Sequence, residues 1–251
     1  MNTKIKRKYF DQIKFLYANA YDNEKRKKDK LVHLWGYYVT RPISMIIAPF
    51  FIKLGVRANH ATFLSLFVGL ISLFFGTLGH LLFSAILYNI FLIFDALDGN
   101  LARYLEPTKK GELMDAIVGD LLNFSFLPCL SIGLTYSKLN EFCLIKSIFE
   151  LLLPFAFISS LLLAISILIA QRVKIILNNP IKLVNQNNSR FIYLLEIIFR
   201  NSFGMAFIGP FSIVFTAFKA LDIFILYNLF ISVVVLIYTI FSAMKSATNL
   251  K

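Results

Sequence analysis

Long apolar runs alternate along the chain with short polar connections. Six of these runs approach or exceed the ~20 apolar residues that an α-helix needs to cross a bilayer. The connections between them are polar and rich in lysine and arginine. The pattern therefore predicts an all-α integral membrane protein with six transmembrane helices. The predicted spans are residues 62–78, 81–102, 111–136, 144–170, 204–218 and 222–243.

A basic segment without a long apolar run precedes the first span. Residues 1–40 are polar with scattered aromatic side chains, and the apolar stretch Ile43–Leu54 is too short to cross a bilayer. This composition is typical of an amphipathic helix lying in the membrane interface, and the short stretch favours an interfacial or re-entrant position. We therefore expect an N-terminal basic interfacial segment over residues 1–60 and a six-helix transmembrane domain over residues 61–251.

The composition supports the same class of protein. Of the 251 residues, 58% are hydrophobic and 16% are charged, and 27 are phenylalanine. Soluble domains carry about 25% charged residues, so a water-soluble fold of this size is excluded. The two cysteines, Cys129 and Cys143, lie at no metal-ligand spacing from a histidine and indicate no disulfide framework.

The net charge of +12 is located mainly in the polar connections between the apolar runs. Lysine and arginine gather in the N-terminal segment, the 103–110 and 171–203 connections and the C-terminal tail. Because cytoplasmic connections carry such an excess, both termini are expected on the cytoplasmic side of the cell's inner or plasma membrane. Basic residues also attract anionic headgroups. We therefore expect membrane lipids, and no nucleic acid, as partners.

Acidic residues concentrate at one place in this apolar chain. Six of the fourteen fall within residues 94–120, where the second span ends and the third begins. Carboxylates beside hydrocarbon are costly unless another charge compensates them. A divalent cation supplies that charge, and all-oxygen ligands favour Mg²⁺, Mn²⁺ or Ca²⁺ over zinc; a structural network of ion pairs with nearby basic residues is the alternative. The predicted metal ligands or metal-adjacent bases are Asp95, Asp98, Asp115 and Asp120.

Small residues accompany these carboxylates. Gly99, Ala102 and Gly111 would let a phosphate-bearing ligand approach the backbone, whereas the structural alternative is close helix packing through small residues. Asp95 and Asp98 are three residues apart and therefore share one face of a helix.

The order and spacing of these residues closely resemble the signature of the CDP-alcohol phosphatidyltransferase family, D-x2-D-G-x2-A-R-x(7–9)-G-x3-D-x3-D. The upstream stretches 41–44 and 57–62 resemble, more weakly, the family's entry into its first span. Beyond about residue 136 the resemblance is only hydropathic. The matching residues are Asp95, Asp98, Gly99, Ala102, Arg103, Gly111 and Asp115.

The resemblance implies a reaction and the residues that perform it. An alcohol attacks the phosphorus of a CDP-linked substrate and CMP leaves, assisted by two Mg²⁺ or Mn²⁺ ions. Such ions stabilise both the attacking and the leaving oxygens. On this likeness, Arg103 contacts the donor, although it is alternatively a counter-ion of Asp98. The implied metal ligands are Asp95, Asp98 and Asp115, and the implied CDP pocket is lined by Gly99, Ala102, Arg103 and Gly111.

One position departs from the family pattern. The final aspartate is expected at position 119, where this chain has Gly119 followed by Asp120. On a regular helix Asp115 and Asp120 lie about 140° apart, against about 40° for a four-residue spacing. We expect a π-bulge, eased by Gly119, to bring Asp120 into the cluster as metal ligand and general base. Without it, altered chemistry or loss of activity follows.

The expected function is therefore that of a membrane phosphotransferase of phospholipid synthesis, with CDP-diacylglycerol as the leading donor. The alternatives are headgroup transfer from a soluble CDP-alcohol, a catalytically inactive relative, and a divalent-ion transporter, which would place its acids near the bilayer midplane. Lys109, Lys110 and Asn123 are candidate contacts to the acceptor alcohol. The site is expected to open to the cytoplasm, and a homodimer is suggested by analogy with the family.

Overall fold

The computed structural model describes residues 9–20, 26, 29, 33–105, 108–137, 144–177 and 208–248. Regular structure in these residues is entirely helical. Most of the predicted 171–203 connection, the first eight residues and Cys143 lie outside the described residues. The helices are α1 (Tyr9–Phe15), η2 (Leu16–Ala20), η3 (Gly36–Thr40), α3 (Arg41–Lys53), α4 (Ala58–Thr77), α5 (Leu81–Leu105), α6 (Lys109–Tyr136), η5 (Lys146–Leu151), α7 (Leu152–Leu177), α9 (Ile208–Ala217) and α10 (Leu221–Thr248).

Five described helices are long and apolar enough to cross a membrane: α4, α5, α6, the helix over Phe149–Ile169 and α10. The prediction of an all-α integral membrane protein is therefore confirmed. The count of six is not, because the predicted span 204–218 corresponds to α9, which has ten described residues. Ten helical residues extend about 15 Å, roughly half the hydrocarbon thickness of a bilayer. Residues 204–207 of that predicted span lie outside the described part.

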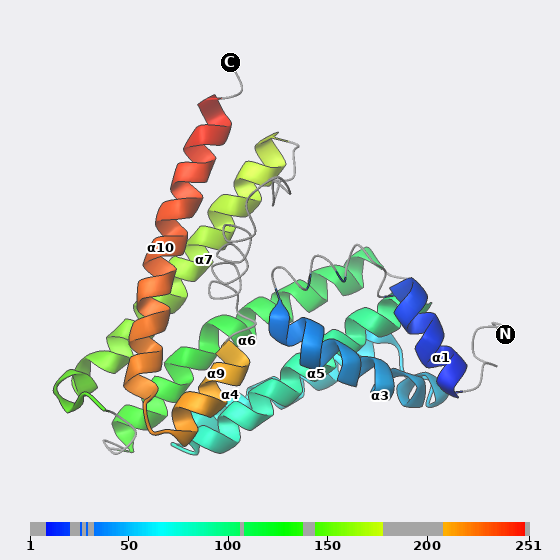
Figure 1. Ribbon diagram of the computed structural model, residues 1–251, viewed down its shortest axis with the longest axis horizontal. Helices are drawn as coiled ribbons and strands as arrows, with labels where there is room; N and C mark the ends of the chain where they lie inside the picture. The colour runs from blue at the N-terminus through cyan, green and yellow to red at the C-terminus, as the bar shows by residue number, and fades with distance from the viewer. Residues whose placement is uncertain are drawn as a thin grey trace.

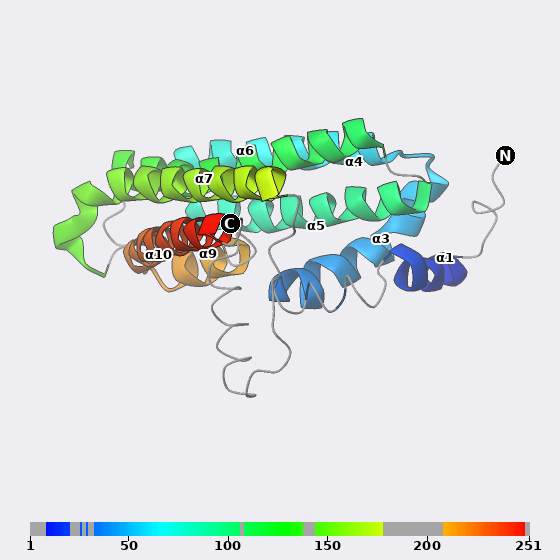
Figure 2. The same cartoon turned by 90° about the horizontal axis from the view of Figure 1, so that it is seen from above.

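The helix α5 is the central element of the bundle. It packs against α4 along its length and also contacts α3, α6 and α9, while α7 and α10 run side by side (Figures 1 and 2). In the core, Tyr88 of α5 stacks on Phe126 of α6 with ring centroids 3.8 Å apart. The helices α4 and α6 meet through small residues, since a β-carbon on Gly133 would lie 1.9 Å from the carbonyl oxygen of Gly76. This close packing joins the C-terminal ends of α4 and α6.

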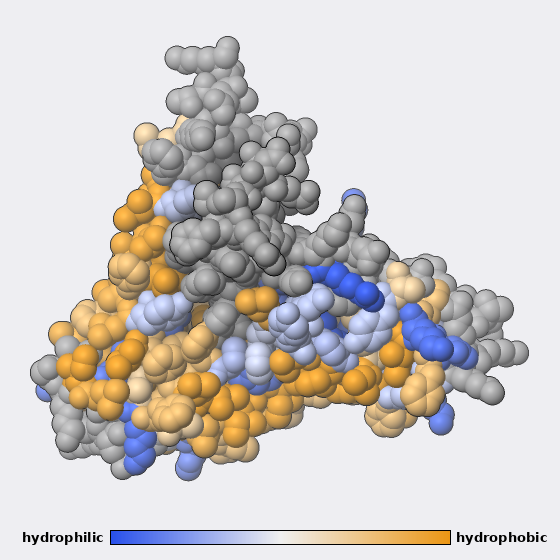
Figure 3. All heavy atoms as spheres, viewed as in Figure 1, coloured by the Kyte–Doolittle hydropathy of each residue, from blue (hydrophilic) through white to orange (hydrophobic). Residues whose placement is uncertain are grey.

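The surface is largely apolar. Orange, hydrophobic residues cover much of the described face in Figure 3, and hydrophilic residues gather chiefly in the half that carries α1 and α3. Large side chains such as Phe63, Phe67 and Phe74 of α4 are exposed. Such a surface suits lipid acyl chains as its surroundings.

The predicted interfacial stretch Ile43–Leu54 coincides closely with α3. One face of α3 is buried against α5, where Met45 and Ile52 join a cluster with Leu97 and Leu101. The depth of α3 in a membrane and the division of the chain at residue 60 stay predictions. What the packing does establish is that the first turn of α3 lies beside the polar end of α5.

Candidate active site

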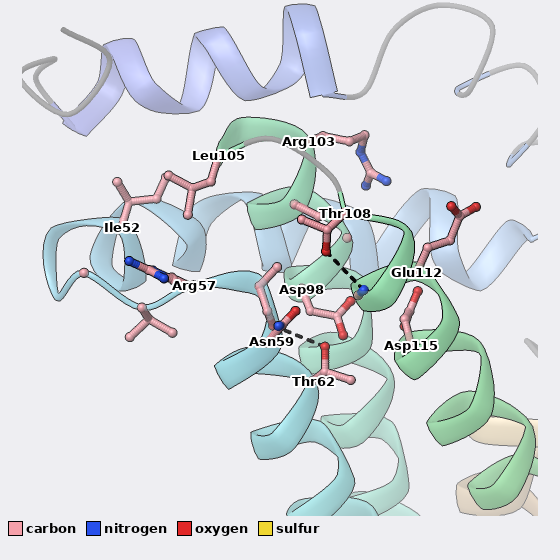
Figure 4. A pocket seen from close by; sticks show the side chains of 16 residues that line it. Ile52, Arg57, Asn59, Thr62, Asp98, Arg103, Leu105, Thr108, Glu112 and Asp115 are labelled. Carbon is pink, nitrogen blue, oxygen red and sulfur yellow. Dashed lines mark hydrogen bonds between the residues drawn. The ribbon is translucent and has the colours of Figure 1, made fainter. Parts of the chain in front are cut away.

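A pocket of about 920 Å³ opens where α5 ends and α4 and α6 begin (Figure 4). Its walls come from all three helices and from the turn before α4. The polar and small residues lining it are Gly55, Arg57, Ala58, Asn59, Thr62, Asp98, Gly99, Ala102, Arg103, Thr108, Gly111, Glu112 and Asp115.

Two helix N-termini point toward this pocket. Thr108 caps α6, and its hydroxyl accepts a hydrogen bond from the Gly111 amide at 3.1 Å. A β-carbon on Gly111 would lie 3.0 Å from Asn59 Oδ1, so glycine lets α6 approach the first turn of α4. Helix N-termini carry partial positive charge and unpaired N–H groups, which favour anionic ligands.

Asp98 is the most deeply buried acid of the site. Its exposed fraction is 2%, and neither carboxylate oxygen has a hydrogen-bond partner among the described residues. The adjacent Thr62 donates its hydroxyl proton to the Ala58 carbonyl oxygen at 3.2 Å instead. A buried carboxylate without hydrogen-bond partners is costly, so a ligand that supplies positive charge or donors would stabilise it.

The other two motif aspartates lie beside Asp98. Asp95 interacts electrostatically with Asp98, Asp115 and Arg41, and Asp98 with Asp115 and Arg41. Arg41, at the start of α3, also forms an ion pair with Asp29, with 3.3 Å between Nε and Oδ2. Arg103 also interacts electrostatically with Asp98 and Asp115. The three neighbouring carboxylates therefore face two arginines, of which Arg41 is already paired.

The chemistry of these three carboxylates fits divalent cations. All the potential ligand atoms are oxygens, the group is strongly anionic, and the Asp98 oxygens have no described hydrogen-bond partner. The carboxylates of Asp95, Asp98 and Asp115 do not converge on one point, however. Among the described residues, no three His, Cys, Asp or Glu groups are arranged closely enough to hold a metal ion. Ligation by Asp95, Asp98 and Asp115 therefore requires their side chains to rotate towards one another.

The expected π-bulge is absent. The helix α6 is regular through residues 109–136, so Asp120 remains about 140° from Asp115 around its axis. Position 119 faces the cluster instead: a β-carbon on Gly119 would lie 3.9 Å from Asp95 Oδ1. The structure thus brings together Asp95, Asp98 and Asp115 and leaves Asp120 apart from them.

Arg103 lies next to Gly99, which precedes it by one helical turn on α5. A β-carbon on Gly99 would be 3.3 Å from both terminal guanidinium nitrogens of Arg103. The guanidinium donates from Nη2 to Asn100 Oδ1 at 2.9 Å. Arg103 interacts electrostatically with Asp98 and Asp115, although no ion pair joins it to Asp98 within the described ranges. Its donor contact and its counter-ion role therefore both stay predictions.

The predicted acceptor contacts lie elsewhere. Lys109 and Lys110 are exposed on the first turn of α6 and do not line the pocket. Asn123 accepts a hydrogen bond from the Tyr88 hydroxyl through its Oδ1, deeper between α5 and α6. These three residues are therefore not gathered with the motif residues.

Several pocket residues escaped the sequence prediction. Asn59, Thr62 and Thr108 line the cavity, and Arg41 lies beside its carboxylates. For Arg41, Asn59 and Thr62 the available signal was the weak family resemblance of stretches 41–44 and 57–62. For Thr108 it was the position before a predicted helix start, where such polar residues commonly serve as caps. Their role as pocket walls depends on how α3, α4 and α6 are placed around α5.

Comparison with known proteins defines the class to which this site belongs. The profile of the CDP-alcohol phosphatidyltransferase family matches residues 56–244, which is most of the chain. The chain belongs to this family, and the membership predicted from the motif is confirmed. The family comprises membrane transferases of phospholipid biosynthesis that use divalent metal ions.

A phosphatidylinositol phosphate synthase from Corynebacterium glutamicum is similar to part of this protein. The two are 33% identical over 108 residues, a stretch that covers 41% of this chain and 49% of that protein. The match therefore spans about half the length of the relative.

Proposed function

We propose that this protein transfers a phosphatidyl group from CDP-diacylglycerol to an alcohol acceptor, with release of CMP, in phospholipid synthesis. The observation that carries the proposal is the pocket itself. It places the motif residues of α5 and α6, including Asp98, Asp115 and Arg103, around one cavity of about 920 Å³. A cavity of that volume is large enough for a nucleotide.

The residues have complementary tasks in this reaction. Asp95, Asp98 and Asp115 hold two Mg²⁺ or Mn²⁺ ions, which, when bound, neutralise charge on the diphosphate. The helix N-termini and Arg103 orient the donor phosphates, while Gly99, Ala102 and Gly111 leave room for them. Asp120 is assigned no step, since it points away from the other three acids.

The name of the relative favours an inositol phosphate as the acceptor. The residues of the pocket itself do not choose between this acceptor, glycerol phosphate and serine. The distribution of basic residues supports a site and two termini that face the cytoplasm.

A donor and acceptor panel tests the proposal. Purified protein in lipid nanodiscs is supplied with radiolabelled CDP-diacylglycerol, Mg²⁺ or Mn²⁺, and inositol phosphate, glycerol phosphate or serine in turn. We expect CMP release and a labelled lipid product with one acceptor, and no product after addition of EDTA. In a second series, soluble CDP-alcohols replace CDP-diacylglycerol as donors and a lipid serves as acceptor; product in that series alone would instead support headgroup transfer. No product from either donor class would indicate an inactive relative.

A further inference from the structure

A chain of three hydrogen bonds connects the N-terminal helix α3 to Arg103 in the pocket. Arg103 Nη2 donates to Asn100 Oδ1 at 2.9 Å, and Asn100 Nδ2 donates to Ser44 Oγ at 2.7 Å. Ser44 Oγ in turn donates to the Arg41 carbonyl oxygen at 2.9 Å. Every donor in this chain meets an acceptor, so its direction is fixed from the pocket to the backbone of α3.

Both middle members are sealed from solvent. Ser44 and Asn100 each have an exposed fraction of 0%, and they come from different helices, 56 positions apart. Buried polar side chains are costly unless they are bonded, and a satisfied buried pair fixes one arrangement of its neighbours. The pair therefore locks the Asn100 side chain so that its Oδ1 faces Arg103.

The position of the Arg103 guanidinium depends on this Asn100–Ser44 hydrogen bond. The edge formed by its two terminal nitrogens faces Gly99, and the guanidinium makes one described side-chain bond, the one to Asn100. Its Nε is buried and has no partner among the described residues, although the residue lines the pocket. An arginine held this way has already lost its rotamer freedom before a ligand binds. Its remaining N–H donors can therefore bind the ligand at a smaller entropic cost.

We propose that Ser44 and Asn100 are positioning residues that hold the guanidinium of Arg103 in the pocket to receive the diphosphate of the CDP-linked donor. This proposal rests on the proposed function, because it assumes the cytidine-diphosphate ligand. It also gives α3 a task in the site, since the last acceptor of the chain belongs to its first turn.

The test measures affinity and turnover separately. The dissociation constant of CDP is measured by calorimetry in the presence of Mn²⁺, alongside KM and kcat for CDP-diacylglycerol. Ser44→Ala is expected to weaken CDP binding roughly fivefold, about the factor that one hydrogen bond contributes. The KM for the donor rises by the same factor, while kcat and the KM for the acceptor stay near the wild-type values.

A matched control is Ser232→Ala. Ser232 is equally buried and donates to the Leu229 carbonyl oxygen at 2.8 Å within α10. This substitution is expected to leave CDP affinity unchanged. Asn100→Ala serves as the second variant if Ser44→Ala does not yield folded protein, and it is expected to weaken CDP binding at least as much.

A double-mutant cycle asks whether Ser44 acts through Arg103. Once Arg103→Ala has removed the guanidinium, adding Ser44→Ala is expected to cause no further loss of affinity. A full additional fivefold loss in that background overturns the proposal, and so does unchanged CDP affinity in both single variants. If the wild-type protein binds no CDP and releases no CMP, the proposed function itself fails and the positioning role fails with it.

Discussion

Gly119 of α6 faces Asp95 of α5. A β-carbon built on Gly119 would find Asp95 Oδ1 at 3.9 Å, and no other described side chain within 4 Å. The space beside Asp95 is therefore open at the position where the family signature carries its final aspartate. This relationship bears directly on how many carboxylates the site can offer to a cation.

Gly119→Asp is expected to add a fourth carboxylate to the cluster. A β-carbon at this position fits in ordinary van der Waals contact, and a further anionic oxygen ligand strengthens binding of a hard cation. We expect Mn²⁺ affinity, measured by calorimetry, to increase about tenfold. Gly119→Asn is the control of equal size and is expected to give a smaller increase. Equal Mn²⁺ affinity in Gly119→Asp and the wild type would show that position 119 does not reach the cations.

Asp120→Asn is expected to keep CMP release within about threefold of the wild-type rate. In the regular helix α6 this carboxyl points away from Asp115, and no described hydrogen bond or ion pair involves it. The rate is measured with saturating donor and acceptor. A loss of a hundredfold or more would mean that α6 changes register when substrate binds, and it would support the sequence prediction of Asp120 as general base.

The positions of the helices near the site were predictable from the sequence. The spans predicted over 81–102 and 111–136 differ from α5 and α6 by no more than three residues at any end. The apolar runs stop where charged residues begin, and a short connection between two antiparallel helices necessarily brings those ends together. The site residues of the motif could therefore be placed around one pocket in advance.

The rotation of α6 was not predictable, because it is fixed by packing with a distant helix. Val118, Leu122 and Phe126 form one buried stripe at a four-residue spacing. Leu122 fills the space above Gly69 of α4, where a β-carbon would lie 2.3 Å from its Cδ1. A bulge at Gly119 would shift Leu122 and Phe126 relative to Val118 and break this stripe. The sequence is compatible with a regular α6 and with an α6 that bulges at Gly119. The contact between Leu122 and Gly69 favours the regular helix.

Gly99→Ala is expected to impair donor binding while preserving the fold. The new methyl group would lie 3.3 Å from the terminal guanidinium nitrogens of Arg103, which must shift by a few tenths of an ångström. Alanine is also favoured over glycine in a helix by up to about 1 kcal/mol, so the free energy of unfolding should not fall. We expect the KM for CDP-diacylglycerol to rise about tenfold with an unchanged or higher thermal unfolding midpoint. A wild-type KM would argue against a role for Arg103 in donor binding.

Asp98→Asn separates the metal's effect on stability from its effect on turnover. In wild-type protein, Mn²⁺ at a hundred times its dissociation constant stabilises the fold by about 2.7 kcal/mol, and EDTA removes that gain. Because Asp98 is buried without a hydrogen-bond partner among the described residues, its neutral variant should unfold at the same or a higher temperature than wild type in EDTA. We expect Asp98→Asn to lose both its turnover and most of the Mn²⁺-dependent thermal shift. An undiminished shift would place the cation away from Asp98.

Gly133→Ala and Gly119→Ala form a matched pair on the same helix. At position 133 a β-carbon would lie 1.9 Å from the Gly76 carbonyl oxygen, so α4 and α6 must separate. Overpacking of this kind typically costs 1–3 kcal/mol. At position 119 the one near atom among the described residues is Asp95 Oδ1, at 3.9 Å, and alanine should stabilise the helix by up to about 1 kcal/mol. Thermal unfolding in detergent is therefore expected to shift down for Gly133→Ala and up or not at all for Gly119→Ala. A destabilised Gly119→Ala protein would show that the space beside Asp95 is already filled. The conclusion that position 119 is open would then be wrong.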